Sequence, residues 1–177
     1  MQWHHEPPAW RIDGDRITAQ AGPKTDFWRK TYDGGMRDHG HFYYQPVTGD
    51  FKAEVKVSGE YASLYDHAGL MVRLDETRWM KCGIEFLNGV QHASAVITRD
   101  WSDWSIVPLA NPPAIWLRVV RYAATLEVSY SLDGQVFTLI RQGHVTEEPT
   151  VNVGIMIAAP TGDGFAATFE GFRITQS

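Results

Sequence analysis

Hydrophobic and polar positions alternate along most of this chain. In the segment FKAEVKVSG, residues 51–59, every second residue from Phe51 to Val57 is apolar, and the residues between them are charged. Strands that bury one face in an antiparallel sheet show this period of two. The segment AIWLRVVRY, residues 114–122, repeats the pattern with Ile115 and Leu117 on the apolar side. Both segments predict half-buried antiparallel strands.

Turn residues separate further strands in the second half of the chain. The segment TLEVSYSLDGQVFTLIR predicts a hairpin around Asp133 and Gly134, because an Asp-Gly pair favours a tight turn. The more continuously apolar VNVGIMIAAP predicts a central strand that ends at Pro160. The segment FAATFEGFRIT predicts the last strand, with Gly171 at a bulge or bend.

The whole chain is predicted to be all-β. Residues 3–20 indicate one or two short strands interrupted at Asp13 and Gly14, and no window of twelve residues keeps a helical period. About a dozen short strands with turns between them are typical of a sandwich or barrel. We expect a single domain over residues 1–177, in which the terminal segments RITAQA and FRITQS lie together.

The stretch YDHAGLMVRLDETRWMKCGIEF, residues 65–86, predicts two strands joined by the turn DETR. Alternation places apolar side chains and Cys82 on the core face. It places charged and aromatic side chains on the other face, where Gly83 leaves a gap. The polar face carries Arg73, Trp79, Lys81 and Glu85. Either this face is the floor of a ligand groove, or its charges pair with each other across the strands.

Trp101 and Trp104 lie in the polar segment RDWSDWSIVPL, which we expect to be loop-like. Aromatic rings beside hydroxyl and carboxylate groups are typical of sugar sites, but both rings also suit a cap on the core. Trp28 in the segment TDFW allows the same two interpretations.

Composition narrows the functional class. The 177 residues include 44% hydrophobic residues, seven Trp and a net charge of −5, without a block of Lys or Arg, so we expect no nucleic-acid partner. The single cysteine, Cys82, excludes a disulfide within the chain and fits a reducing cytoplasm, where we expect it to be a buried thiol. We expect no signal peptide and no membrane span, since no apolar run approaches the required ~20 residues.

Candidate catalytic and metal-binding groups are few. Most glycosidases need two carboxyl groups; Glu85 is the one catalytic candidate, and nothing in the spacing favours Asp66 or Asp103 as its partner. His39 and His41 share one side of an extended strand, yet no nearby Glu completes a metal site, so we expect surface or turn histidines. We therefore expect neither a metal nor a cofactor.

Several segments together resemble one family. In order they are YDHAGLMVR, WMKCGIEF, SDWS, WLRVVR, YSLDG, GIMIAAP and FEGFRI. They resemble the concanavalin A-like family of unknown function, whose members are sometimes labelled regulation-of-enolase proteins. The resemblance covers Thr25 to Ile174, with His67 where Gln is more usual and Cys82 where Ala is more usual.

The resemblance implies a two-sheet antiparallel jelly-roll sandwich of the lectin and glucanase type. In that fold the outer surface of the concave sheet is the usual carbohydrate site, and the family implies no established catalytic residues. Fold alone does not give function.

We therefore expect a non-catalytic module that binds a carbohydrate or another polyhydroxylated ligand on its concave sheet. The expected ligand-binding residues are Asp66, His67, Arg73, Trp79, Lys81, Glu85 and Trp104. One alternative is a glycoside-active enzyme with Glu85 as acid/base. Another is a protein-interaction or regulatory module in carbohydrate metabolism. The sequence leaves the oligomeric state open.

Overall fold

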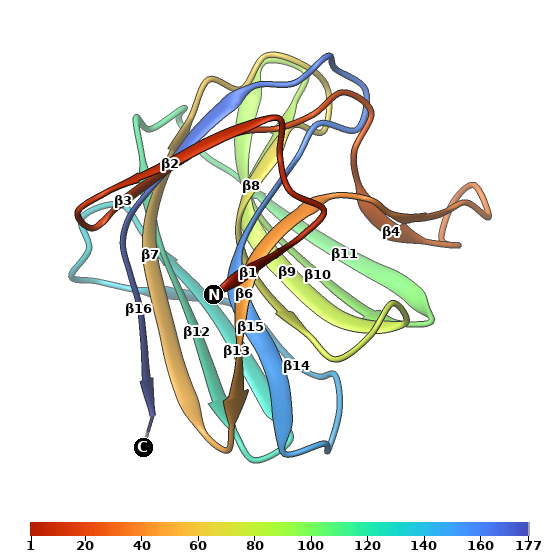
Figure 1. Ribbon diagram of the computed structural model, residues 1–177, viewed down its shortest axis with the longest axis vertical. Helices are drawn as coiled ribbons and strands as arrows, with labels where there is room; N and C mark the ends of the chain where they lie inside the picture. Colours follow the sequence, from red (N-terminus) through yellow and green to blue (C-terminus); the bar gives the residue numbers. More distant parts are fainter. Residues whose placement is uncertain (177) are drawn as a thin grey trace.

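The computed structural model describes residues 1–176, which form only strands and their connections (Figure 1). The strands in chain order are β1 (Gln2–His4), β2 (Ala9–Asp13), β3 (Arg16–Gln20), β4 (Phe27–Arg29), β5 (Met36–Asp38), β6 (His41–Thr48), β7 (Phe51–Gly59), β8 (His67–Arg73), β9 (Arg78–Leu87), β10 (Val90–Arg99), β11 (Trp101–Pro108), β12 (Ile115–Tyr122), β13 (Thr125–Ser131), β14 (Thr138–His144), β15 (Thr150–Ala158) and β16 (Ala166–Gln176). No helix within residues 1–176 could span a membrane.

Two antiparallel sheets of seven strands lie face to face (Figure 1). Sheet A has the strand order β1-β6-β15-β8-β9-β10-β11, and sheet B has the order β14-β13-β12-β7-β16-β3-β2. The short β4–β5 hairpin belongs to neither sheet and projects beside β11 (Figure 1). The structure therefore confirms the predicted all-β sandwich.

The main core lies between the two sheets. Sheet A contributes fully buried Leu70 and Ile155, and sheet B contributes fully buried Leu117 and Phe169. These residues occupy alternate positions of their strands, so each strand turns one row of apolar side chains inward. Burial of such rows is the main force that holds two sheets together.

The alternation in the sequence predicted several strands correctly. The segment FKAEVKVSG is β7, and VNVGIMIAAP supplies all of β15 except Thr150; β15 pairs with β6 and β8 inside sheet A. Gly171 has a φ of 62°, and the register of β16 against β7 shifts between Glu170 and Arg173. The predicted bulge is therefore confirmed.

One prediction is confirmed in part and another needs correction. The terminal strands pair as expected, since RITAQ forms β3 and pairs with residues 166–170 of β16, but the later part of β16, which holds FRITQ, pairs with β7 and not with β3. The final residue of the segment FRITQS lies outside the described residues. The segment around Trp101 and Trp104 is the edge strand β11, not a loop. An edge strand buries less of its surface, so a polar composition does not exclude it.

Candidate functional site

Strands β8 and β9 divide their side chains between two faces as the alternation predicted. Met80, Cys82 and Ile84 point into the main core. In the paired strand, Leu70 lies directly opposite Cys82, and Gly69 lies opposite Gly83. The charged and aromatic residues of both strands therefore occupy the outer face of sheet A.

A segment between β3 and β6 lies over part of this outer face. Phe27 of β4 is fully buried against Trp79, with ring centroids 6.3 Å apart. Four further buried residues complete this second apolar cluster: Phe42, Met71, Val96 and Met156. We call residues 22–40, which include the β4–β5 hairpin, the cover segment. Trp79 lies beneath it and exposes no ring surface to solvent.

Lys81 ties the cover segment to sheet A. Its buried Nζ lies 2.8 Å from the carbonyl oxygen of Phe27 and 3.3 Å from Oδ1 of Asp26. Burial acts to raise the pKa of Asp26, but the charge of Lys81 and its hydrogen bond hold that pKa below its ordinary value. The carboxylate is therefore ionised, and the buried ammonium group has an opposite charge beside it.

His67 completes this buried group. Its Nε2 lies 3.1 Å from Lys81 Nζ, and its Nδ1 lies 2.8 Å from the carbonyl oxygen of Tyr65. Burial first, and then the charge of Lys81, lower the pKa of His67. A neutral imidazole that donates from Nδ1 to Tyr65 and accepts at Nε2 from Lys81 satisfies both contacts.

Arg73 makes a second tie to the cover segment. Its two terminal nitrogens donate to the two carboxylate oxygens of Asp38 at 2.6 and 2.8 Å. His4 and Arg73 hold the pKa of Asp38 below its ordinary value, against the opposing effect of burial. Such a fork of two parallel hydrogen bonds fixes direction as well as distance. The charges of Arg73 and Lys81 are thus paired with the cover segment.

Asp66 lies apart from this face. Its Oδ2 accepts hydrogen bonds from the backbone N–H groups of Ala62 and Ser63 at 3.0 and 2.8 Å. The side chain is almost completely buried, and Oδ1 has no hydrogen-bond partner among residues 1–176. Asp66 therefore orders the loop before β8.

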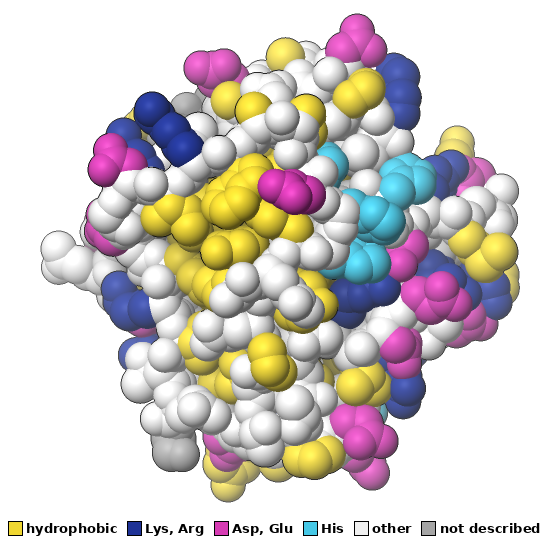
Figure 2. Space-filling view, in the orientation of Figure 1, with side chains coloured by type: hydrophobic (Ala, Val, Ile, Leu, Met, Phe, Trp, Pro, Cys, Tyr) yellow, Lys and Arg dark blue, Asp and Glu magenta, His cyan; other side chains and the backbone are white. Residues whose placement is uncertain are grey.

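The histidines near the N-terminus lie beside the cover segment: His4 stacks edge-on against His5 and lies 3.6 Å from Asp38, and Nδ1 of His39 accepts from the N–H of Asp26. Histidines gather into one patch on the face shown in Figure 2. His41 lies buried at the start of β6, although we expected a surface or turn position. Its Nε2 accepts from the N–H of Gly22 at 2.9 Å, and its Nδ1 lies 2.8 Å from the carbonyl oxygen of His5. Burial lowers the pKa of His41, so the ring is neutral. No cluster in residues 1–176 has the arrangement of a metal site.

Glu85 lies on the outer face of sheet A as a buried residue, with 7% of its surface exposed. Its Oε2 accepts from Oγ of Ser94 at 2.6 Å and from Nε1 of Trp104 at 2.8 Å. Its Oε1 makes no hydrogen bond within residues 1–176 and is not among the buried atoms that lack a partner. This second oxygen is therefore left with the capacity to accept from a further donor.

The Trp104 ring beside this carboxylate contacts two further aromatic rings. The Trp104 ring lies 6.2 Å from the Tyr65 ring and 6.5 Å from the Trp28 ring, and both contacts are edge-to-face. Trp104 and Tyr65 are each 37% exposed. We call Trp28, Tyr65, Glu85, Ser94 and Trp104 the Glu85 corner. It combines a rigid hydrogen-bond acceptor with partly exposed aromatic surface.

The sequence pointed to Glu85 and Trp104 but missed Ser94 and Tyr65. Ser94 lies opposite Gly83 in the register of β9 and β10, so its approach to Glu85 follows once that register is known. The cover segment left no signal in the sequence, because Asp26 and Asp38 contact residues 35 or more positions away.

Two seven-stranded antiparallel sheets packed face to face, with no helix in residues 1–176, define an all-β antiparallel sandwich. Within that class the chain belongs to the family described as protein of unknown function (DUF1349), whose model matches residues 3–177. The resemblance noted in the sequence is thus confirmed.

Known relatives share this fold. The chain is 36% identical over 174 residues to "Regulation of enolase protein 1" of Saccharomyces cerevisiae, a match that covers 98% of this chain and 88% of the yeast protein. A solved structure of a functionally unknown protein from S. cerevisiae has a TM-score of 0.95 and 36% identity, and covers 99% of this chain and 96% of that one.

More distant solved structures share the fold alone. One is carbohydrate binding module CBM66 from Bacillus subtilis, with a TM-score of 0.64 and 10% identity over 98% of this chain and 95% of that one. Another is the GH43 protein BlXynB from Bacillus licheniformis, with a TM-score of 0.73 and 16% identity over 97% of this chain and 36% of that one. The fold is thus one that carbohydrate-related proteins also use.

Proposed function

We propose that this protein is a non-catalytic module that binds a carbohydrate at the Glu85 corner. The observation that carries the proposal is the carboxylate of Glu85, whose Oε1 makes no hydrogen bond within residues 1–176, beside the partly exposed rings of Trp104 and Tyr65. A carboxylate oxygen accepts hydrogen bonds from sugar hydroxyls, and an aromatic ring packs against the apolar face of a sugar. The shared fold of a carbohydrate binding module supports the same class of ligand.

The seven residues expected to bind the ligand take two roles in this proposal. Glu85 and Trp104 contact the sugar directly. His67, Arg73, Trp79 and Lys81 hold the cover segment in place, and Asp66 orders the loop that carries Tyr65. These five are positioning residues, because their polar groups or rings already contact other parts of the protein.

Two hydrogen bonds preorganise the acceptor. Ser94 and Trp104 both donate to Oε2, so the carboxylate is held in one orientation before a ligand arrives. Hydrogen bonds to a charged group contribute about 1.5–3 kcal/mol each. A carboxylate fixed in advance loses little entropy on binding, which favours even a shallow site.

Calorimetric titration with a panel of neutral mono- and oligosaccharides tests the proposal. We expect saturable binding that Glu85→Gln weakens roughly tenfold, since it replaces a charge-assisted hydrogen bond by a neutral one. Trp101→Phe is the control, because Trp101 lies on β11 with Trp104 and is 58% exposed, but it is not part of the Glu85 corner.

Absence of binding to every sugar at millimolar concentration, with a folded protein, would contradict the proposal. Release of products from a glycan, lost in Glu85→Gln, would replace it with the glycoside-active alternative. Capture of a protein partner without any sugar binding would favour the regulatory alternative.

A further inference from the structure

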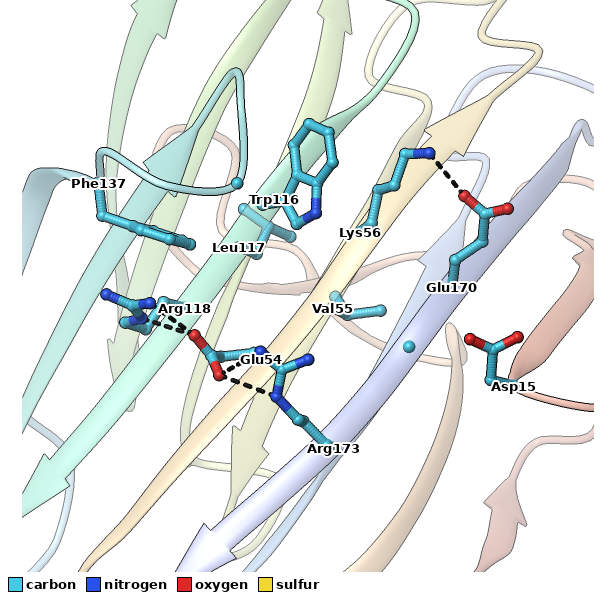
Figure 3. Close-up of a pocket in the computed structure, with 12 residues that line it drawn as sticks. Asp15, Glu54, Val55, Lys56, Trp116, Leu117, Arg118, Phe137, Glu170 and Arg173 are labelled. Carbon is cyan, nitrogen blue, oxygen red and sulfur yellow. Dashed lines mark hydrogen bonds and ion pairs between the residues drawn. The ribbon is translucent and has the colours of Figure 1, made fainter.

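The outer face of sheet B carries an open groove of about 270 Å³ (Figure 3). This volume lies near the lower end of the range for small-molecule sites. Its walls come from β7, β12 and β16, from the connection between β13 and β14, and from the turn between β2 and β3. The Glu85 corner lies on sheet A, so the two regions occupy different sheets.

The bulge in β16 shapes the floor of this groove. Glu170 pairs in register with Lys56, and Arg173 pairs with Glu54, so three steps along β16 match two steps along β7. The extra residue turns Glu170 and Arg173 toward the same face. Gly171 between them has open space where a side chain would project. The floor therefore stays open at the bulge.

One wall is a prearranged loop that rises above the sheet. Oδ1 of Asp133 accepts from the N–H groups of Gln135 and Val136 at 2.8 and 2.9 Å, which holds the loop in a tight turn. Phe137 at the end of this loop lies over the guanidinium group of Arg118, 3.6 Å from the ring centroid. The wall therefore needs little reordering when a ligand arrives.

A clamp of charged groups lines the floor. Oε1 of Glu54 accepts from Arg118 at 2.7 and 2.8 Å, and Oε2 accepts from Arg173 at 2.8 and 3.0 Å. Glu170 lies opposite and pairs with Lys56 at 2.8 Å (Figure 3). Both acidic groups are neutralised by their partners.

The lining charges also balance in number. Asp15, Glu54 and Glu170 are opposed by Lys56, Arg118 and Arg173. Arg16 and Lys52, outside the lining, also pair with Glu170 and Glu54. Each cation of the lining already pairs with one of these acids, so none is left unpaired to attract a phosphate or carboxylate. Lys56 Nζ already lies 5.3 Å from the centroid of the Trp116 ring, where a ligand cation would otherwise bind. The balance favours a neutral ligand.

Trp116 supplies a free donor at the edge of the groove. Its Nε1 makes no hydrogen bond within residues 1–176, is not among the buried atoms that lack a partner, and points toward the groove in Figure 3. Asp15 on the opposite side forms no pair with the other residues drawn. Donors and acceptors thus face each other across a space the size of one small ring.

From this arrangement we infer a second ligand site on sheet B, which takes a neutral polyhydroxylated ligand of about one sugar ring. Trp116 Nε1 donates to a ligand oxygen, the unused N–H groups of Arg173 donate to others, and Asp15 and Glu170 accept from hydroxyls. The site does not depend on the Glu85 corner, and the protein with both sites has a binding surface on each sheet.

Nuclear magnetic resonance of the indole N–H groups tests this site directly, because each of the seven Trp residues gives its own signal. The Trp116 and Trp104 signals are assigned from the Trp116→Phe and Trp104→Phe proteins. We expect the Trp116 signal to shift saturably when glucose, galactose, mannose, xylose or arabinose is added. Trp116→Phe keeps a ring but loses the donor, so the affinity at this site falls roughly fivefold to tenfold.

The same spectra separate the two sites. A shift of the Trp116 signal without a shift of the Trp104 signal supports the sheet B site and contradicts the Glu85 corner. A shift of Trp104 alone, or of neither signal, overturns the sheet B site. A Trp116 shift with phosphate or sugar phosphates but not with neutral sugars also overturns it, since the groove would then select an anion. Tyr122→Phe, an exposed change on β12 outside the groove, is the control.

Discussion

Arg73 of β8 and Asp38 of β5 are joined by two hydrogen bonds of 2.6 and 2.8 Å across 35 residues of sequence. Together with Lys81 and the carbonyl oxygen of Phe27, this pair holds the cover segment on sheet A. The charged residues of the outer face therefore act mainly within the protein, and four predictions follow from their environment and that of the core.

Loss of one partner of the Arg73–Asp38 pair should destabilise the protein. We expect Arg73→Met to lower the free energy of unfolding by about 2–3 kcal/mol, because Asp38 then keeps a half-buried charge with weaker pairing. The Asp38 side chain is more exposed than that of Arg73, so Asp38→Asn should lower the free energy of unfolding by about 1 kcal/mol. Urea unfolding measures both. The double variant should lose less stability than the two single variants lose together, because both remove the same interaction. A double-variant loss equal to the sum would mean that the pair contributes nothing.

The cover segment should open before the sandwich unfolds when its anchor is removed. We expect Phe27→Ala to cost about 3–5 kcal/mol and to speed hydrogen exchange mainly within residues 22–40. Phe169→Ala in the main core should have a similar cost but speed exchange across both sheets. Equal exchange patterns in the two variants would show that the cover segment is not a separate cooperative unit.

Stability should fall as the pH drops from 7 toward 5. The pKa values of His67 and His41 are lowered in the folded protein, mainly by burial, so the unfolded chain binds protons more readily than the folded one. The stabilisation is complete above the unfolded pKa of about 6.5 and is lost as the pH falls below it. The urea midpoint at several pH values measures this loss.

His67→Gln provides the matched variant for the pH experiment. Glutamine keeps an acceptor for Lys81 without a titrating ring, and Gln is the residue that the family resemblance leads us to expect at this position. We expect a shallower dependence of stability on pH between 7 and 5 than in the unaltered protein. An unchanged slope would mean that His67 does not carry the effect.

Cys82 should be inert in the folded protein. Burial raises the pKa of its thiol to about 12, and the thiolate is the reactive form. We expect a disulfide reagent at pH 8 to leave the native protein unmodified and to label one thiol per chain in urea. Rapid labelling of the native protein would show that sheet A opens locally at β9.

The sequence by itself determined much of the sandwich. Period-two alternation marks a strand through its own side chains, so β7, β12 and the two faces of β8 and β9 were predicted from local pattern. Gly171 marked the bulge because its positive φ disfavours other residues. The alternation also predicted correctly that the charged residues between positions 73 and 85 share the outer face of the sheet.

Only the tertiary structure decided what that face contacts. Alternation shows which side a side chain takes, but it does not show which distant segment will lie over that side. Lys81 contacts Asp26, which is 55 residues away in the sequence, and Trp104 contacts Glu85, which is 19 residues away. The partner of each charge therefore depends on strand order and on the path of the cover segment. The groove on sheet B depends likewise on a bulge in β16 and a loop after β13, which lie near each other only when the strands of sheet B are paired in order.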